Sequence, residues 1–207
     1  MKLVSRRPRR RAGFTLIEMI GVLAIIAILA SMLIPRIFSA INEARVTGTA
    51  FSYNGLKSAA ITYFGKYGRI GGNGGTNFTA AQLTNGVSNW DRTYLLPGGF
   101  IEKAFETTLA VSANVQVIAA PIAGTSVTAI NAAYDLDGTG VLPNNATGRV
   151  VLQLVLSGVF EEDARDLNQK LDGTSLGTTS GADLLGRVKY AAASSGLTDV
   201  YIYVAHK

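Results

Sequence analysis

The chain has 207 residues, of which 48% are hydrophobic and 16% are charged, and it contains no cysteine. The missing cysteines exclude a disulfide framework, thiol chemistry and a cysteine metal site. The net charge of +5 is local, because residues 1–13 hold six of the 19 basic residues and no acid. The rest of the chain is nearly neutral and has no excess charge for binding nucleic acid.

The first predicted element is a membrane-spanning helix. Residues 14–34 contain one charged side chain, Glu18, and as a helix they would span ~31 Å, about one bilayer core. The basic residues before it predict that residues 1–13 stay in the cytoplasm and that the C-terminal part is exported. The apolar run is too long for a secretory signal peptide, and Ser5-Arg6-Arg7 matches a twin-arginine signal only weakly. A carboxylate inside such a span costs roughly 2–3 kcal/mol, so Glu18 needs a partner and indicates a function.

The residues around this carboxylate resemble a known processing site. The sequence GFTLIE at residues 13–18 is similar to the cleavage site of type IV prepilins and type II secretion pseudopilins. The resemblance implies that a membrane aspartyl peptidase cuts after Gly13 and methylates the new N-terminal Phe14. Glu18 would then be the fifth residue of the mature chain. Pro35 stands where pilins commonly have a helix-kinking proline.

Cleavage would provide Glu18 with a charged partner. The cut creates a positive amino group on Phe14, four residues before Glu18, which is about one helical turn. Alternatively, the amino group of a neighbouring subunit reaches Glu18 during assembly. Because an unpaired carboxylate in lipid is costly, neutralising it would favour stacking each subunit on its predecessor.

The helix is expected to continue beyond the span. Apolar residues recur at three-, four- and seven-residue steps to about Tyr67, with interruption or softening expected at Pro35, Gly48 and Gly55. The glycine-rich stretch that follows lacks the ending of a phosphate-binding loop and is expected to be a flexible connection. The predicted division is a cytoplasmic leader at 1–13, a transmembrane and assembly helix at 14–35, its amphipathic continuation at 36–67 and a periplasmic α+β domain at 68–207.

From about residue 110 the pattern favours strands separated by turn residues. The last two strands should form a C-terminal hairpin in which Val200, Ile202 and Val204 share one face. A long helix packed against an antiparallel sheet defines an α+β fold, which the pilin resemblance also implies. The predicted strand runs are 111–120, 125–136, 149–157, 186–193 and 199–206.

A second helix is expected over residues 158–173, with Gly173 as its cap. Acids crowd its first turn, where the helix dipole favours them, so the acidic group is interpreted as a solvated face rather than a metal or acid–base site. That group comprises Glu161, Glu162, Asp163 and Asp166, and the apolar stripe comprises Phe160, Ala164, Leu167 and Leu171.

A candidate ion site lies at residues 135–140. Asp135 and Asp137 precede two glycines, and such a stretch can place oxygens around a hard cation such as Ca²⁺. It is not an EF-hand loop, and an Asp-Gly hairpin turn is the alternative. Several major pseudopilins carry a calcium site in their late β-region. No other cofactor is indicated, and the single histidine, His206, is interpreted as a solvated terminal residue.

These features favour a structural filament subunit, a pseudopilin of a type II secretion system, and not an enzyme. The partners that the resemblance implies are the prepilin peptidase and N-methyltransferase, other pseudopilin or pilin subunits, the inner-membrane assembly platform and the lipid bilayer. The alternative is a surface type IV pilin used in adhesion, motility or DNA uptake, for which Lys66, Arg69 and Arg92 form a loose basic cluster. A membrane-tethered hydrolase using Asp135 and Asp137 is disfavoured, because no nucleophile and base accompany them.

Overall fold

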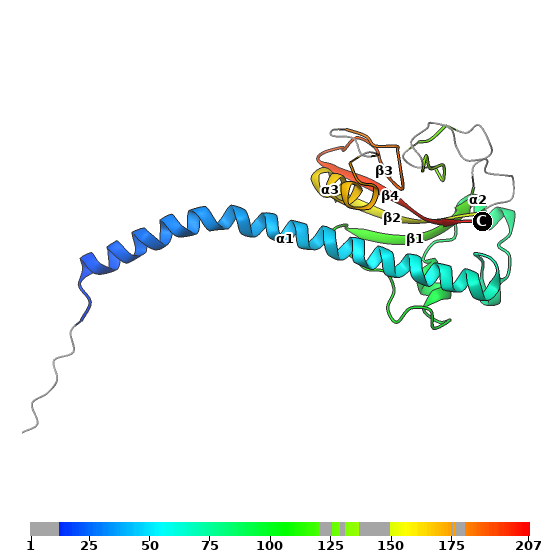
Figure 1. Ribbon diagram of the computed structural model, residues 1–207, viewed down its shortest axis with the longest axis horizontal. Coiled ribbons are helices and arrows are strands. Elements are labelled where there is room, and N and C mark those ends of the chain that lie inside the picture. Colours follow the sequence, from blue (N-terminus) through cyan, green and yellow to red (C-terminus); the bar gives the residue numbers. More distant parts are fainter. Residues whose placement is uncertain (1–12, 121–125, 129–130, 137–149, 175, 177–180) are drawn as a thin grey trace, which may run out of the picture. The chain divides into compact units, whose positions relative to one another are not determined.

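The computed structural model describes residues 13–120, 126–128, 131–136, 150–174, 176 and 181–207. The chain divides into two compact units, Met1–Ile41 and Asn42–Lys207. The helices are α1 (Leu16–Tyr67), α2 (Ala80–Asn85) and α3 (Glu161–Asp172), with a 3₁₀ turn at Asn73–Gly75 and a π-helical turn at Asp91–Leu95. The strands are β1 (Ser112–Ala119), β2 (Val150–Phe160), β3 (Val188–Tyr190) and β4 (Leu197–His206), as labelled in Figure 1.

Within the first unit, α1 is apolar on every side. Its side chains up to Ile41 are exposed, except for a half-buried Ala30. A helix of this kind lacks the polar face of a surface helix and needs lipid or other helices around it. The helix runs without a break through Pro35, and later through Gly48 and Gly55, so the expected interruptions are not present. A kink at Pro35 stays a prediction.

The second unit is built on a four-stranded antiparallel sheet with the strand order β1-β2-β4-β3 (Figure 1). The predicted C-terminal hairpin is confirmed, since β3 pairs with β4 and Val188 lies opposite Ile202. Val200, Ile202 and Val204 are buried together, as predicted. The prediction of a strand at 125–136 is wrong for the described part of that range, where the one strand-like residue is an isolated bridge at Asp135.

The second part of α1 packs against this sheet. Tyr53 and Tyr63 are each 1% exposed, and the Tyr53 hydroxyl donates a hydrogen bond to the Tyr203 carbonyl of β4 at 2.6 Å. This contact fastens the helix to a central strand, so the α+β, pilin-like architecture is confirmed. The buried face of α1 has the three- and four-residue spacing of an amphipathic helix and consists of Val46, Thr49, Ala50, Tyr53, Leu56, Ala59, Ala60 and Tyr63.

The second helix, α3, is confirmed. Ala164 and Leu167 are fully buried, and the helix ends at Gly173, whose φ of 77° favours glycine. Phe160 is an error of the sequence analysis: it is the last residue of β2 and its side chain is 58% exposed. The strand continues past its predicted end through a bulge between Leu156 and Val159, which changes the direction of the side chains that follow.

The glycine-rich stretch after α1 is anchored rather than a free linker. The Tyr63 hydroxyl and the Trp90 indole N–H both donate to the Gly71 carbonyl, at 3.2 and 2.9 Å. Gly75 has a φ of +75°, and a Cβ there would lie 2.6 Å from the Cβ of Tyr67. Glycine therefore lets this backbone approach the end of α1, which a larger residue would prevent.

Candidate processing and assembly site

The predicted cleavage point lies just before α1. Gly13, Phe14 and Thr15 precede the helix, and the side chain of Phe14 is 80% exposed. A Cβ on Gly13 would meet no described atom, and its φ is outside the left-handed region. The fold therefore does not explain a glycine at this position. Recognition by an external enzyme would explain it.

Glu18 is held by a capping box at the start of α1. The Thr15 hydroxyl oxygen accepts a hydrogen bond from the Glu18 backbone N–H at 3.3 Å. In return, Oε2 of Glu18 accepts hydrogen bonds from the Thr15 backbone N–H and the Thr15 hydroxyl, both at 2.8 Å. This reciprocal arrangement satisfies donors that the first helical turn leaves free. Thr15 is a site residue that the sequence analysis missed, although the Thr-x-x-Glu spacing is a local signal for it.

The capping box leaves half of the carboxylate available. Oε2 takes both hydrogen bonds from Thr15, while Oε1 of Glu18 accepts none from the part of the chain that the structure describes. A second donor, such as an ammonium group, can therefore bind Oε1 without displacing Thr15. Glu18 is suited to two partners at once, one within its own helix and one outside it.

Within the described residues, α1 is the one helix long and apolar enough to cross a membrane. Its most apolar stretch of 18 residues has a mean hydropathy of 2.6, and none of that stretch is buried. The apolar side chains exposed along it include Leu16, Ile17, Leu23, Ile25, Ile28, Leu29 and Met32. These features are consistent with a single-pass membrane anchor.

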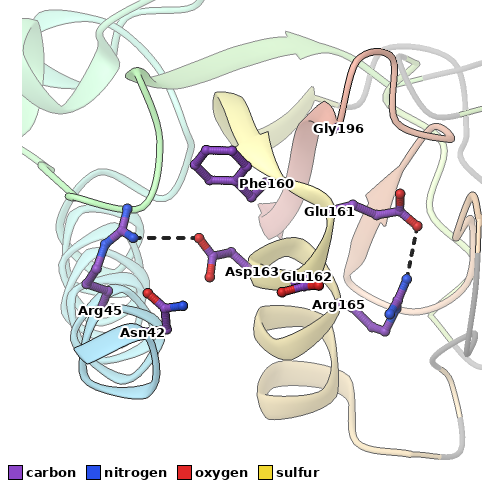
Figure 2. A pocket seen from close by; sticks show the side chains of 8 residues that line it. All are labelled: Asn42, Arg45, Phe160, Glu161, Glu162, Asp163, Arg165 and Gly196. Carbon is purple, nitrogen blue, oxygen red and sulfur yellow. Dashed lines mark hydrogen bonds and ion pairs between the residues drawn. The ribbon is translucent and has the colours of Figure 1, made fainter. Parts of the chain in front are cut away.

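A cavity of about 530 Å³ lies at the first turn of α3, lined also by residues of α1 and β2 (Figure 2). Asp163 is 4% exposed and its Oδ2 lies 3.9 Å from a terminal nitrogen of Arg45, while Glu161 and Arg165 pair at 2.9 Å. The expected solvated face is therefore wrong for Asp163. Burial raises the pKa of Asp163, and the neighbouring Arg45 acts in the opposite direction. The pairing links α3 to α1, which is a structural role.

The candidate calcium residues are only partly described. Asp135 is 1% exposed, and its backbone carbonyl accepts a hydrogen bond from the Gly186 N–H at 2.7 Å. Asp137 lies outside the described residues. No group of three or more His, Asp or Glu side chains among the residues that can be described is placed to hold a metal ion. Calcium binding stays a prediction.

The loose basic cluster is separated into individual contacts. Lys66 lies over the rings of Tyr67 and Phe100, both at 5.3 Å. Arg69 donates to the Asn77 side chain at 3.1 Å, and Arg92 lies 3.9 Å from Glu106. Each of the three cations therefore has its own partner. His206, for its part, is exposed as expected and contacts the Tyr203 hydroxyl.

The fold and the N-terminal helix define a class: a pilin-like α+β domain with a long apolar N-terminal helix that is consistent with a membrane anchor. Residues 8–34 match the family model of the prokaryotic N-terminal methylation motif, and the match includes Gly13, Phe14 and Glu18. This match supports a type IV prepilin-like protein. That family consists of structural subunits rather than enzymes. Comparisons with curated proteins and with solved structures give no match.

Proposed function

We propose that the chain is a pseudopilin, a filament subunit of a type II protein secretion system. The observation that carries the proposal is the methylation motif at residues 8–34, which includes the proposed cut and the first part of α1, where the helix is apolar on every side. A prepilin peptidase would remove residues 1–13 on the cytoplasmic side and methylate Phe14. The retained helix would anchor the domain in the inner membrane until the subunit joins a periplasmic filament.

Glu18 is the proposed assembly residue. Its free oxygen, Oε1, would accept the ammonium group of Phe14, either from the same chain or from a neighbouring subunit. Two opposite charges that meet in an apolar environment relieve the cost of each, and this relief exists only where the pair forms. Pairing between subunits would therefore favour incorporation of a subunit at a defined stagger.

A surface type IV pilin is the alternative, and two observations favour a pseudopilin. The chain lacks cysteine, so it lacks the C-terminal cysteine pair common in adhesive pilins. The basic residues Lys66, Arg69 and Arg92 are engaged separately, which gives little support for a DNA-uptake surface. Deleting the gene should abolish export of secreted proteins and leave surface filaments unchanged. Loss of motility or DNA uptake with normal export would support the pilin instead.

Processing is tested by mass spectrometry of the N-terminus, in cells with and without the prepilin peptidase. The expected product begins at methylated Phe14 and appears only when the peptidase is present. A chain that stays uncut, or one that loses the apolar helix with its leader, would exclude the proposed processing.

The assembly role is tested with three variants. Glu18→Val should insert into the membrane normally but be lost from filaments, as measured by crosslinking and shearing. Glu18→Gln retains an oxygen that can complete the capping box but removes the charge, so it should fail in the same way. Glu43→Val removes an exposed acid from the same helix and should assemble normally. Normal assembly of Glu18→Gln together with failure of Glu18→Val would assign the effect to the capping box.

A further inference from the structure

Strand β3 contains a lysine that is completely buried. Lys189 is 0% exposed, whereas lysine is almost never fully buried unless a partner compensates its charge. No carboxylate in the described part of the chain lies within ion-pair distance of it. The charge must therefore be stabilised in another way.

The Lys189 nitrogen is surrounded by oxygens from a single segment. Nζ donates to the Thr128 carbonyl at 2.8 Å, the Ala133 carbonyl at 2.7 Å and the Asn131 side-chain oxygen at 3.1 Å. It also contacts the Asn131 carbonyl, and it lies 4.2 Å from the centre of the Tyr134 ring. An ammonium group has three N–H donors, and an unprotonated amine has two. Only the charged form can donate to oxygens on all three residues at once.

Two influences on this charge oppose each other. Burial lowers the pKa of Lys189 to about 7. The surrounding oxygens and the Tyr134 ring favour the ammonium form, because their negative ends point at the cation. Two nearby hydroxyl groups add no negative charge at neutral pH, because burial raises the pKa of Tyr134 and of Tyr201, which lies opposite on β4. Asp183 is bonded to the Leu185 N–H and the Asn168 amide.

The segment that surrounds Lys189 covers the second face of the sheet. Ala132 and Tyr134 pack with Val151, and Ile118 and Tyr203 border this cluster. The Tyr134 hydroxyl also donates to the Gln153 side chain at 2.9 Å. The lysine therefore holds in place the chain that shields this face from water.

We infer that the oxygens of Thr128, Asn131 and Ala133 form a cation-binding site, which the chain fills with its own Lys189 ammonium. The oxygens around the Lys189 nitrogen are uncharged carbonyl and amide oxygens, which suit a monovalent cation. A calcium site would normally include carboxylates. Emptied of the lysine side chain, the site should accept a small primary alkylammonium ion. The proposed cation site uses neither Asp135 nor Asp137, so it is separate from the candidate calcium site.

The inference is tested on the full chain in detergent micelles with Lys189→Ala. The atoms removed correspond to n-propylammonium. Adding this ion should therefore reverse most of the decrease in the unfolding midpoint of Lys189→Ala, whereas adding Ca²⁺ should not. Neutral n-propanol fills the same space without a charge, and tetramethylammonium has a charge but no N–H donor, so neither should restore it. Lys103→Ala, at a lysine whose side chain is 75% exposed, should leave the midpoint unchanged. Equal rescue by n-propanol, or no loss of stability in Lys189→Ala, would overturn the inference.

A second measurement applies even if Lys189→Ala does not fold. In the unaltered chain, the buried ammonium should give a slowly exchanging ¹⁵N–¹H resonance at neutral pH, because its protons are hydrogen-bonded and shielded from water. Lys189→Met keeps the length of the side chain and removes the cation, and it should lose this resonance. A chain that shows no such resonance holds no ammonium in the site, and the inference fails.

Discussion

Removing one hydroxyl group, in Tyr63→Phe, tests how the glycine-rich stretch is anchored. The buried hydroxyl donates to the carbonyls of Gly71, at 3.2 Å, and Gly72. The Gly71 carbonyl keeps its hydrogen bond from Trp90, and the Gly72 carbonyl keeps one from the Gly75 backbone N–H, both at 2.9 Å. Neither acceptor is therefore left unsatisfied. What is lost is the net contribution of one buried hydrogen bond, about 0.5–1.5 kcal/mol. For a domain of this size, the loss lowers the melting temperature by about 1–6 °C.

Trp90 provides the assay. It is the chain's single tryptophan, it is fully buried, and its ring centre lies 5.1 Å from that of Tyr63. Its fluorescence during urea unfolding in micelles therefore reports on the region that is altered. Tyr67→Phe is the matched control: its ring centre is 4.7 Å from that of Tyr63, and its hydroxyl makes no hydrogen bond to the described residues. This control should stay within about 0.5 kcal/mol of the parent chain.

Comparing the urea midpoints of Tyr63→Phe and Tyr67→Phe tests whether the Tyr63 hydroxyl anchors the loop. If Tyr63→Phe unfolds at the same urea concentration as Tyr67→Phe, the hydroxyl does not anchor the loop. The position of the loop would then depend on the hydrogen bond from Trp90 to the Gly71 carbonyl and on the close packing of Gly75 against Tyr67.

Two further predictions concern β2 and α3. Gly158→Ala should destabilise the domain more than Gly99→Ala: both glycines have a φ of +71°, but only at Gly158 would a Cβ meet Val111, at 2.9 Å. The excess should be roughly 1 kcal/mol or more and should shrink when Val111→Ala is added, and equal losses in urea unfolding would contradict this. Because burial raises the pKa of Asp163, the folded chain binds this proton more tightly than the unfolded chain, so stability should fall as pH rises through the range just above 3.8. Asp163→Asn should flatten that part of the pH profile of unfolding, and an unchanged slope would show that the carboxylate is not responsible.

The elements that the sequence predicts well are those whose information is local. The three- and four-residue spacing of the buried residues in α1 follows from the period of a helix, and the alternation of Val200, Ile202 and Val204 follows from the period of a strand. The end of α3 at Gly173 follows from a local backbone requirement. The capping box of Thr15 and Glu18 is equally local, and it was missed because the carboxylate was interpreted only as a charge.

The residues that the sequence does not predict depend on distant partners. Asp163 has neighbours that suggest a solvated helix start, and it is buried because Arg45 reaches it from α1. Lys189 lies between Val188 and Tyr190 in a strand whose three residues are all buried, so alternation contains no signal for its position. Its environment comes from Thr128, about sixty residues earlier. Such pairs are specified by the tertiary fold rather than by any pattern in their own segment.

The position of the proposed cut fits the geometry at the start of α1. Cleavage between Gly13 and Phe14 leaves the Thr15 nitrogen as an amide, so its 2.8 Å hydrogen bond to Glu18 can persist in the mature chain. A cut one residue later would convert that nitrogen itself into the new ammonium group, so the same atom would carry both the charge and the cap hydrogen bond. The proposed processing after Gly13 would therefore create a charge near Glu18 on a different nitrogen from the one that caps the helix. The carboxylate can then remain bound to Thr15 through Oε2 and still offer Oε1 to an incoming ammonium group.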